Sequence, residues 1–296
     1  MPCNSRPPDV TSRPVQPSER FTLPASSYNF DQLADIYNQC RVDYIVPMPM
    51  NGKRMTEYVK YYDIDLDGSV VSLNESQLET GISMLGIRGD RSWITRLGVI
   101  PDRRGHKIGQ YLMEALIEES AARNLSRVQL EVIVGNEPAH HLFCKLGFED
   151  YRELMVVRRP PGKPTEDLNI AAANVSEIDE GQILYYLEQR DYIATWHDET
   201  ASFLNASNLH GLSVELANGE TGWIIFQRTP FQLTRFAVGP FNTPDAMRTL
   251  LYHVHSEYAM QDTKIENIPS QSTLWPVFQS MGYIEVFRRI EMFLDL

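Results

Sequence analysis

The sequence has no long apolar run and few cysteines. No stretch of its 296 residues approaches the roughly 18 consecutive apolar residues of a membrane-spanning helix. The three cysteines, Cys3, Cys40 and Cys144, lack the spacing of a zinc site or a disulfide framework, and the seven histidines are scattered. These absences predict a soluble protein of a reducing compartment, the cytoplasm, with no membrane partner and no metal.

Positive charge is also scarce. The chain carries 27 Lys and Arg against 39 Asp and Glu, a net charge of -12, and nearly all of this excess lies in residues 164–296. Phosphate neutralisation by basic side chains dominates the affinity of proteins for nucleic acids, so the sequence predicts no nucleic-acid partner. The acidic second half either attracts cationic substrates or forms a solvated surface that keeps the protein in solution.

Proline-rich stretches divide the chain. Proline and serine recur through residues 1–20, which have no apolar core of a secretory signal, so we expect a disordered lead there. Residues 160–166, Pro-Pro-Gly-Lys-Pro-Thr-Glu, are typical of a linker. A chain of this length with 43% hydrophobic residues can form two cores. The sequence therefore predicts one domain over residues 21–159 and another over residues 167–296.

The most informative stretch is a strand that turns directly into a helix through a basic loop. Residues 94–100 are apolar and β-branched, Pro101 ends this predicted strand, and helical spacing of apolar residues begins at Ile108. The first turn of a helix presents unpaired backbone N–H groups and a partial positive charge. This combination predicts an anion site suited to phosphate. The loop adds two glycines, which allow close backbone approach, and three cations: Gly105, Gly109, Arg103, Arg104 and Lys107.

The loop matches neither the Walker P-loop nor the glycine fingerprint of dinucleotide-binding folds. Residues 104–109, Arg-Gly-His-Lys-Ile-Gly, resemble the Arg/Gln-x-x-Gly-x-Gly/Ala loop of the Gcn5-related N-acetyltransferases (GNAT superfamily), with Lys107 in place of the first glycine. Residues 136–148, Asn-Glu-Pro-Ala-His-His-Leu-Phe-Cys-Lys-Leu-Gly-Phe, are similar to the Asn-x-x-Ala-x-x-Leu-Tyr-x-x-Leu-Gly-Phe helix of that family. The resemblance implies that backbone amides of the loop hold the pyrophosphate of acetyl-CoA. The alternative is an ordinary strand–helix unit with a basic turn.

Apolar periodicity predicts an α/β fold with a mixed sheet in each half. From residue 21 to residue 159 the predicted element order is β-α-α-β-β-β-α-β-α-β-β, which is also the order of the family. The second half repeats much of this order, and residues 143–148 correspond to residues 278–283, Phe-Gln-Ser-Met-Gly-Tyr. The loop after Val238 has no basic, glycine-containing motif. We therefore expect two tandem acetyltransferase-like domains, of which the second is a degenerate copy that does not bind CoA.

The resemblance also implies roles for individual residues. The backbone of residues 97–99 pairs with pantetheine, and Val99 offers an N–H to the thioester oxygen. Glu131 stands five residues before Asn136, where some relatives keep a general base, although a surface or structural carboxylate is the alternative. Many relatives have a tyrosine that protonates the departing thiolate where this chain has Phe143, whose phenyl ring cannot donate a proton. The expected cofactor contacts are Leu97, Gly98, Val99, Arg104, Gly105, His106, Lys107, Ile108, Gly109, Asn136 and Phe143.

Two functions stay open at this stage. The first is an enzyme, an acyl-CoA-dependent N-acyltransferase that transfers acetyl from acetyl-CoA to an amine of a small molecule or peptide, with the second domain walling the acceptor site. The alternative, favoured by Phe143 and by the degenerate second half, is a non-catalytic acyl-CoA-binding or scaffold protein. Residues 196–199, Trp-His-Asp-Glu, either line an acceptor pocket or form a surface turn. The sequence is compatible with a monomer or a homodimer.

Overall fold

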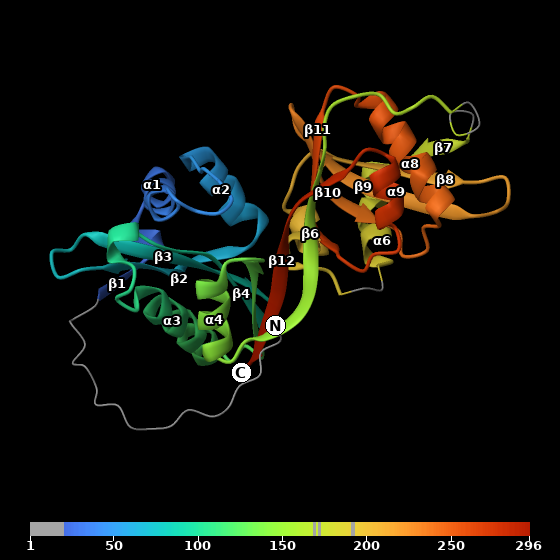
Figure 1. The fold of residues 1–296 in the computed structure, drawn as a ribbon. Helices are drawn as coiled ribbons and strands as arrows, with labels where there is room; N and C mark the ends of the chain where they lie inside the picture. Colours follow the sequence, from blue (N-terminus) through green and yellow to red (C-terminus); the bar gives the residue numbers. More distant parts are fainter. Residues whose placement is uncertain (1–20, 168–169, 171–172, 191–192) are drawn as a thin grey trace. The chain divides into compact units, whose positions relative to one another are not determined.

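The computed structural model describes residues 21–296 apart from 168–169, 171–172 and 191–192, so the predicted disordered lead lies outside the described residues. The chain forms two compact units (Figure 1). Unit 1 comprises the described residues up to Tyr151 together with Ile290–Leu296, and unit 2 comprises Arg152–Arg289. The division along the chain thus falls between Tyr151 and Arg152, whereas the sequence analysis expects it within residues 160–166.

Unit 1 is a mixed sheet with two helices on each face. Strands β1 to β4 are antiparallel neighbours in chain order, and β5 pairs with β4 in parallel. Helices α1 and α2 cover one face of the sheet, and α3 and α4 cover the other (Figure 1). In chain order the elements are β1 (Phe21–Pro24), the 3-10 helix η1 (Ala25–Ser27), α1 (Phe30–Cys40), α2 (Gly52–Tyr61), β2 (Ile64–Leu73), β3 (Glu79–Arg88), β4 (Arg91–Val99), the 3-10 helix η2 (Pro101–Arg103), α3 (Ile108–Ala122), β5 (Arg127–Ile133) and α4 (Glu137–Lys145).

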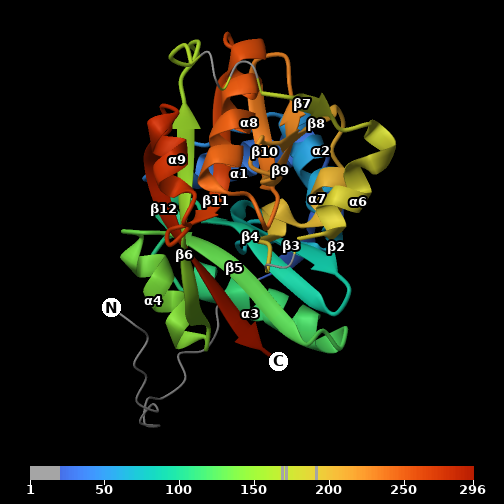
Figure 2. The same ribbon diagram turned by 90° about the vertical axis from the view of Figure 1, so that its right-hand side faces the viewer.

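Two long strands, β6 (Glu149–Arg159) and β12 (Ile284–Asp295), contribute residues to both units. In unit 1 the end of β12 lies beside β5 (Figure 2), and Met292 is fully buried in the core that also contains Phe143. The sequence predicts two strands between α4 and residue 159, and this is wrong, because the described chain forms the single uninterrupted strand β6 there. The strand next to β5 comes instead from the end of the chain.

Unit 2 repeats the architecture of unit 1. Its strands follow the order β6-β11-β10-β9-β8-β7, in which only the β10–β11 pair is parallel among the described pairings. Gly147 and Gly282 close equivalent turns after α4 and α9 with φ of 96° and 89°, so the predicted duplication is confirmed. The elements are β7 (Val175–Glu177), η3 (Glu180–Gln182), α6 (Ile183–Glu188), η4 (Trp196–Asp198), α7 (Thr200–Leu204), β8 (Leu209–Glu215), β9 (Thr221–Arg228), β10 (Gln232–Val238), α8 (Pro244–Glu257), β11 (Asp262–Pro269) and α9 (Trp275–Ser280).

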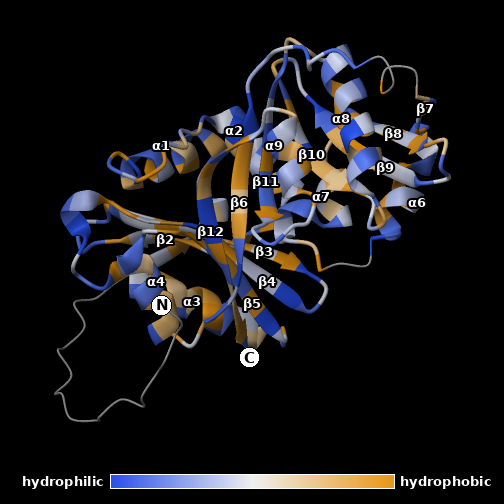
Figure 3. Ribbon diagram, turned by 45° about the vertical axis from the view of Figure 1, so that its right-hand side comes forward, coloured by the Kyte–Doolittle hydropathy of each residue, from blue (hydrophilic) through white to orange (hydrophobic). Residues whose placement is uncertain are grey.

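Apolar residues run along the strands of both units, and each unit buries its own core (Figure 3). In unit 2 one core lies between the sheet and α8 with α9, and a smaller one lies on the other face beneath α6 and α7. Within the part of the chain that the structure describes, none of the helices has the length and hydropathy needed to cross a membrane.

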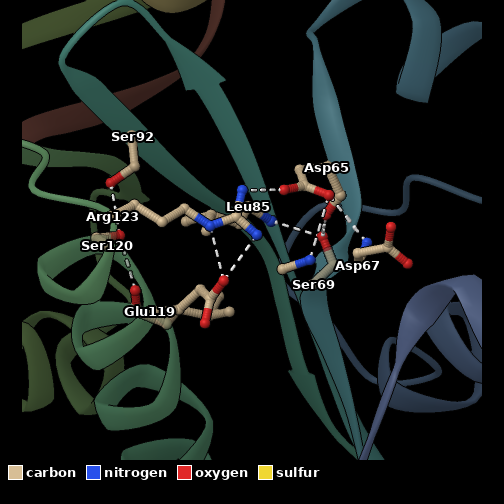
Figure 4. A network of polar contacts seen from close by, with 10 residues as sticks. Asp65, Asp67, Ser69, Leu85, Ser92, Glu119, Ser120 and Arg123 are labelled. Atoms are coloured by element: carbon tan, nitrogen blue, oxygen red, sulfur yellow. Dashed lines mark hydrogen bonds and ion pairs between the residues drawn. The ribbon is translucent and has the colours of Figure 1, made fainter.

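A polar network fixes helix α3 on the sheet of unit 1 (Figure 4). Arg123, at the end of α3, forms ion pairs with Asp65 of β2 and with Glu119 of its own helix. One turn earlier, the Ser120 hydroxyl lies 2.9 Å from the Ser92 hydroxyl of β4 and is fully buried. Buried polar groups that satisfy one another specify a single arrangement. The network therefore sets where the opposite end of α3, its N-terminus, meets the end of β4.

Candidate functional site

Strands β4 and β5 run parallel but separate before their carboxyl ends. Among the described residues, Trp93 and Gln129 form the last pair that joins them, whereas β4 continues to Val99 and β5 to Ile133. Beyond Trp93, Arg96 has a φ of 55° at an irregularity in the pairing of β4 with β3, the kind of bulge that bends a strand. A cavity of about 700 Å³ opens at this end of β4.

The cavity is enclosed by the end of β4, the turn into α3 with the first turn of that helix, one side of α4, and the segment between α1 and α2. This segment is the aromatic and methionine-rich loop of residues 42–50. Two distant motifs of the sequence, the basic loop and the start of the Asn-x-x-Ala helix, therefore meet at one cavity. The predicted cofactor contacts that line it are Leu97, Gly98, Val99, Arg104, Gly105, Lys107, Ile108, Gly109 and Asn136.

The N-terminus of α3 faces this cavity with its backbone amides uncapped. Gly105 and Lys107 both adopt left-handed conformations, with φ of 81° and 59°, and Lys107 precedes the first residue of the helix. Within the described chain no side chain caps this helix, and its first turn contains no acidic residue. A Cβ built on Gly109 would lie 3.7 Å from Leu142 and Val99, which is ordinary contact. The first turn of α3 thus directs N–H groups without an intrahelical acceptor, and the positive end of the helix dipole, toward an anion.

The equivalent turn of unit 2 has the opposite character. The Thr243 side chain accepts a hydrogen bond from the Ala246 amide and so caps α8, and its hydroxyl donates to the Glu220 carboxylate at 2.6 Å. Asp245 adds a negative charge in the first turn. The space beside Gly239 is filled, because a Cβ there would lie 2.5 Å from Asn242. A capped, acidic and filled turn disfavours an anion.

Arg104 lines the cavity, but its guanidinium is already engaged. It donates to both carboxylate oxygens of Asp43, at 2.6 and 2.7 Å, and to the carbonyl oxygens of Cys40 and Val99 at 3.1 and 3.2 Å. The hydrogen bond from Arg104 holds the pKa of the Asp43 carboxyl below its usual value and raises the pKa of Arg104. Arg104 therefore ties the segment between α1 and α2 to the end of β4.

Asn136 makes a contact that the sequence analysis does not contain. It occupies the position before α4, but its side chain makes no capping hydrogen bond within the described chain. Its amide nitrogen donates instead to the Tyr44 hydroxyl at 3.0 Å. The guanidinium of Arg41 lies 3.6 Å from the centre of the Tyr44 ring, a cation–π contact. Nothing in the sequence indicates that Tyr44 of this aromatic loop reaches Asn136.

Three predicted residues lie outside the lining of the cavity. Phe143 is buried in the core of unit 1, with its ring centre 6.1 Å from that of Phe148. His106 turns back toward its own loop, where Nδ1 lies 3.0 Å from the Arg104 carbonyl oxygen. Glu131 is half-buried on β5, two residues past the last pair with β4. Their functional roles stay predictions.

Two clusters of side chains that include histidine lie outside the lining of the cavity. In unit 1, His140, Cys144 and Asp150 bring possible ligand atoms within 4.8 Å of one another, and His140 pairs with Asp150 at 2.8 Å. The expected absence of a metal stays a prediction. In unit 2, Trp196 and His197 are buried, and the amide of Asn267 lies 3.1 Å from Nδ1 of His197. An exposed surface turn is therefore the wrong description of residues 196–199, because their bulky side chains pack inward.

Comparison with known proteins places this cavity in a family context. Residues 30–148 match the acetyltransferase (GNAT) family. A Bacillus subtilis (strain 168) protein, named as a candidate alanine N-acetyltransferase of ribosomal protein bS18, is 29% identical over 92 residues, which are 31% of this chain. The chain spans only 55% of the length of that curated relative.

Solved structures share the fold over nearly the whole chain. A GCN5-related N-acetyltransferase from Sphaerobacter thermophilus is similar with a TM-score of 0.71 and 15% identity, over 94% of this chain and 96% of its own. A tandem GNAT protein from the clavulanic acid biosynthesis pathway is similar with a TM-score of 0.64 and 14% identity, over 94% and 98% of the two chains. At such low identity these likenesses establish the tandem fold.

Proposed function

The chain belongs to the acetyltransferase (GNAT) family, with its matching domain at residues 30–148, and from this premise we propose that it is an N-acetyltransferase. It transfers acetyl from acetyl-CoA to an amine of a small molecule or peptide, in the cytoplasm. The observation that carries the proposal is the single cavity at which the end of β4, the uncapped N-terminus of α3 and Asn136 meet.

The proposal assigns each wall of the cavity to a part of acetyl-CoA. The backbone amides of residues 105–109 hold the pyrophosphate, aided by the dipole of α3. The backbone at Leu97, Gly98 and Val99 aligns the pantetheine, and the amide of Val99 stabilises the oxyanion that forms on the thioester. Holding the thioester and the amine in one orientation supplies much of the rate enhancement of such a transfer.

Unit 2 has a different part in the proposal. Its α8 turn is capped and acidic, so we assign it no CoA site. The acidic excess of residues 164–296 suits an amine acceptor, which is cationic before it is deprotonated. The name of the Bacillus subtilis relative adds N-terminal alanine peptides to the acceptors worth testing.

The alternative is a protein that binds acyl-CoA without turning it over. Phe143 favours it, because this residue is buried against Phe148 and offers no proton to a leaving thiolate. Both functions require acetyl-CoA to bind in the cavity, so binding alone does not separate them. Release of the free thiol in the presence of an amine does.

A two-part measurement tests the proposal on the full-length protein. Acetyl-CoA at about 100 times its dissociation constant should stabilise the fold by about 2.7 kcal/mol, seen as a higher midpoint of thermal unfolding. A screen of small amines, N-terminal alanine peptides and lysine peptides with acetyl-CoA should then release free CoA with at least one class. Protection without release above the spontaneous rate would favour the binding protein, and no protection would contradict both functions.

A further inference from the structure

Transfer of the acetyl group leaves a thiolate that must gain a proton. The side chain at position 143, a phenyl ring in the core, cannot supply it and does not line the cavity. A residue that does so must carry a proton, line the cavity, and lie beside the start of α4. Tyr44 meets these conditions.

The direction of the hydrogen bond between Asn136 and Tyr44 decides whether the Tyr44 proton is available for transfer. The Asn136 amide nitrogen is the donor, so the Tyr44 oxygen accepts this bond and its own proton is not used in it. The guanidinium of Arg41 stacks 3.6 Å from the centre of the Tyr44 ring. An N–H aimed at the oxygen and a cation over the ring both stabilise the negative charge that remains once the proton has left.

The contacts of Asp43, the residue before Tyr44 in the chain, also help to hold Tyr44 in place. Asp43 accepts two hydrogen bonds from Arg104, which is anchored in turn to the carbonyl oxygens of Cys40 and Val99. The segment is therefore fixed to the end of β4 on one side and to the start of α4 on the other. A proton donor must be positioned before its pKa matters, and these contacts position Tyr44.

We propose that Tyr44 is the catalytic acid of this site and protonates the sulfur of the departing CoA; the role rests on the proposed acetyl transfer. The amine nitrogen attacks the thioester carbonyl and loses its proton to a base. As the tetrahedral intermediate collapses, the C–S bond breaks and its electron pair goes to sulfur. The Tyr44 O–H proton passes to that sulfur, and the phenolate regains a proton from water. The products are the N-acetyl amine and CoA as the free thiol.

Cys40 is another proton-bearing side chain that lines the cavity. Its side chain is 2% exposed beneath the end of β4, where a Cβ on Gly98 would lie 2.6 Å from the Cys40 Cβ. Burial raises the pKa of the Cys40 thiol to about 12, so it holds its proton more tightly than an ordinary thiol. Tyr44, half-buried in the wall of the cavity, is the better placed donor.

Kinetics of Tyr44→Phe test the proposal, since this variant keeps the ring and its contact with Arg41 but removes the proton. With the amine found in the acceptor screen, kcat should fall on the order of 10²-fold, while the KM for acetyl-CoA stays within about twofold. The solvent deuterium isotope effect on kcat should fall toward one. Tyr185→Phe, on an exposed tyrosine of unit 2, is the matched control and should leave kcat unchanged.

A binding measurement adds a readout that does not need turnover. The Tyr44 hydroxyl should donate a hydrogen bond to the thiol or thiolate sulfur of free CoA. The thioester sulfur of acetyl-CoA is a poorer hydrogen-bond acceptor. By calorimetric titration, Tyr44→Phe should therefore weaken free CoA severalfold and acetyl-CoA by less than about twofold. Equal effects on both ligands, or a parent-like kcat, would overturn the role of Tyr44 and leave the proposed function intact. A parent protein that binds acetyl-CoA but acetylates no amine would overturn both.

Discussion

Glu131 lies on β5, two residues past the last pair that joins β5 to β4, and the sequence predicts it as a candidate base for the amine. Glu131→Gln keeps the shape of the side chain and removes only its capacity to accept a proton. If Glu131 is the base, kcat should fall on the order of 10²-fold at neutral pH while acetyl-CoA affinity is retained. The loss should shrink as the pH rises, because a larger fraction of the amine is then already deprotonated.

Glu118→Gln is the matched control for this experiment, since Glu118 is exposed on α3 outside the lining of the cavity. Both variants should unfold near the temperature of the parent. A structural carboxylate at position 131 would show a different pattern, with stability and affinity falling together and no rescue at high pH. Parent-like kcat in Glu131→Gln, with chemistry shown to be rate-limiting, would remove this residue from the mechanism.

At the scale of single residues, the sequence indicates many residues that line the cavity, but not the hydrogen bonds that their side chains form. The basic loop and Asn136 can be brought together from the sequence, because each directly precedes a helix whose spacing the sequence shows. Asp43 and Tyr44, the side-chain partners of Arg104 and Asn136, are different, since they come from the irregular segment between α1 and α2. Such a segment has no periodicity from which the direction of Tyr44 could be read.

At the scale of elements, the first turn of α3 separates the two copies of the fold. It is uncapped and has no acidic residue within the described chain, whereas α8 carries its own cap and an acidic first turn. Gly109→Asp places a carboxylate where the pyrophosphate is expected, and should abolish the thermal protection by acetyl-CoA. An acidic residue in the first turn of a helix is favourable by itself, so the variant should still fold.

Gly109→Ala separates the effect of charge from that of size. The added Cβ meets Leu142 and Val99 at 3.7 Å and so fits without displacement. Alanine is also a better helix former than glycine by about 1 kcal/mol within a helix. This variant should unfold no earlier than the parent and should retain much of the protection. Full protection of Gly109→Asp, measured in the same unfolding assay, would place the pyrophosphate elsewhere.

The elements that the sequence predicts least well are strands near the borders of the units. Asp262–Pro269, which forms β11, gives only a weak strand signal in the sequence because polar and charged residues outnumber its apolar ones. β6 is predicted as two strands, although Glu149–Arg159 contains no turn residue that would divide it. Local patterns indicate that a segment is extended. They do not indicate which sheet it joins, because that depends on pairing between residues far apart in sequence.

At the scale of the whole molecule, the two copies exchange their last strands. Met155 and Val157 of β6 lie in the core of unit 2 although they follow the elements of the first copy. Met292 of β12 lies in the core of unit 1, with Ile290 and Leu294 packed against it, although it follows the elements of the second copy. Each unit is thus completed by the other half of the sequence, which makes the linker at residues 160–166 a poor place to cut the chain.

This exchange predicts that the end of the chain stabilises the unit that contains the cavity. Met292 is fully buried, so Met292→Ala should lower the free energy of unfolding of unit 1 by about 2–5 kcal/mol, the usual cost of such a truncation in a core. The cavity itself is unchanged, so acetyl-CoA should still raise the unfolding temperature of the variant. Leu296→Ala, at a residue that is 46% exposed, is the control and should change stability little. An unfolding temperature of Met292→Ala equal to that of the parent would mean that β12 is not part of the core of unit 1.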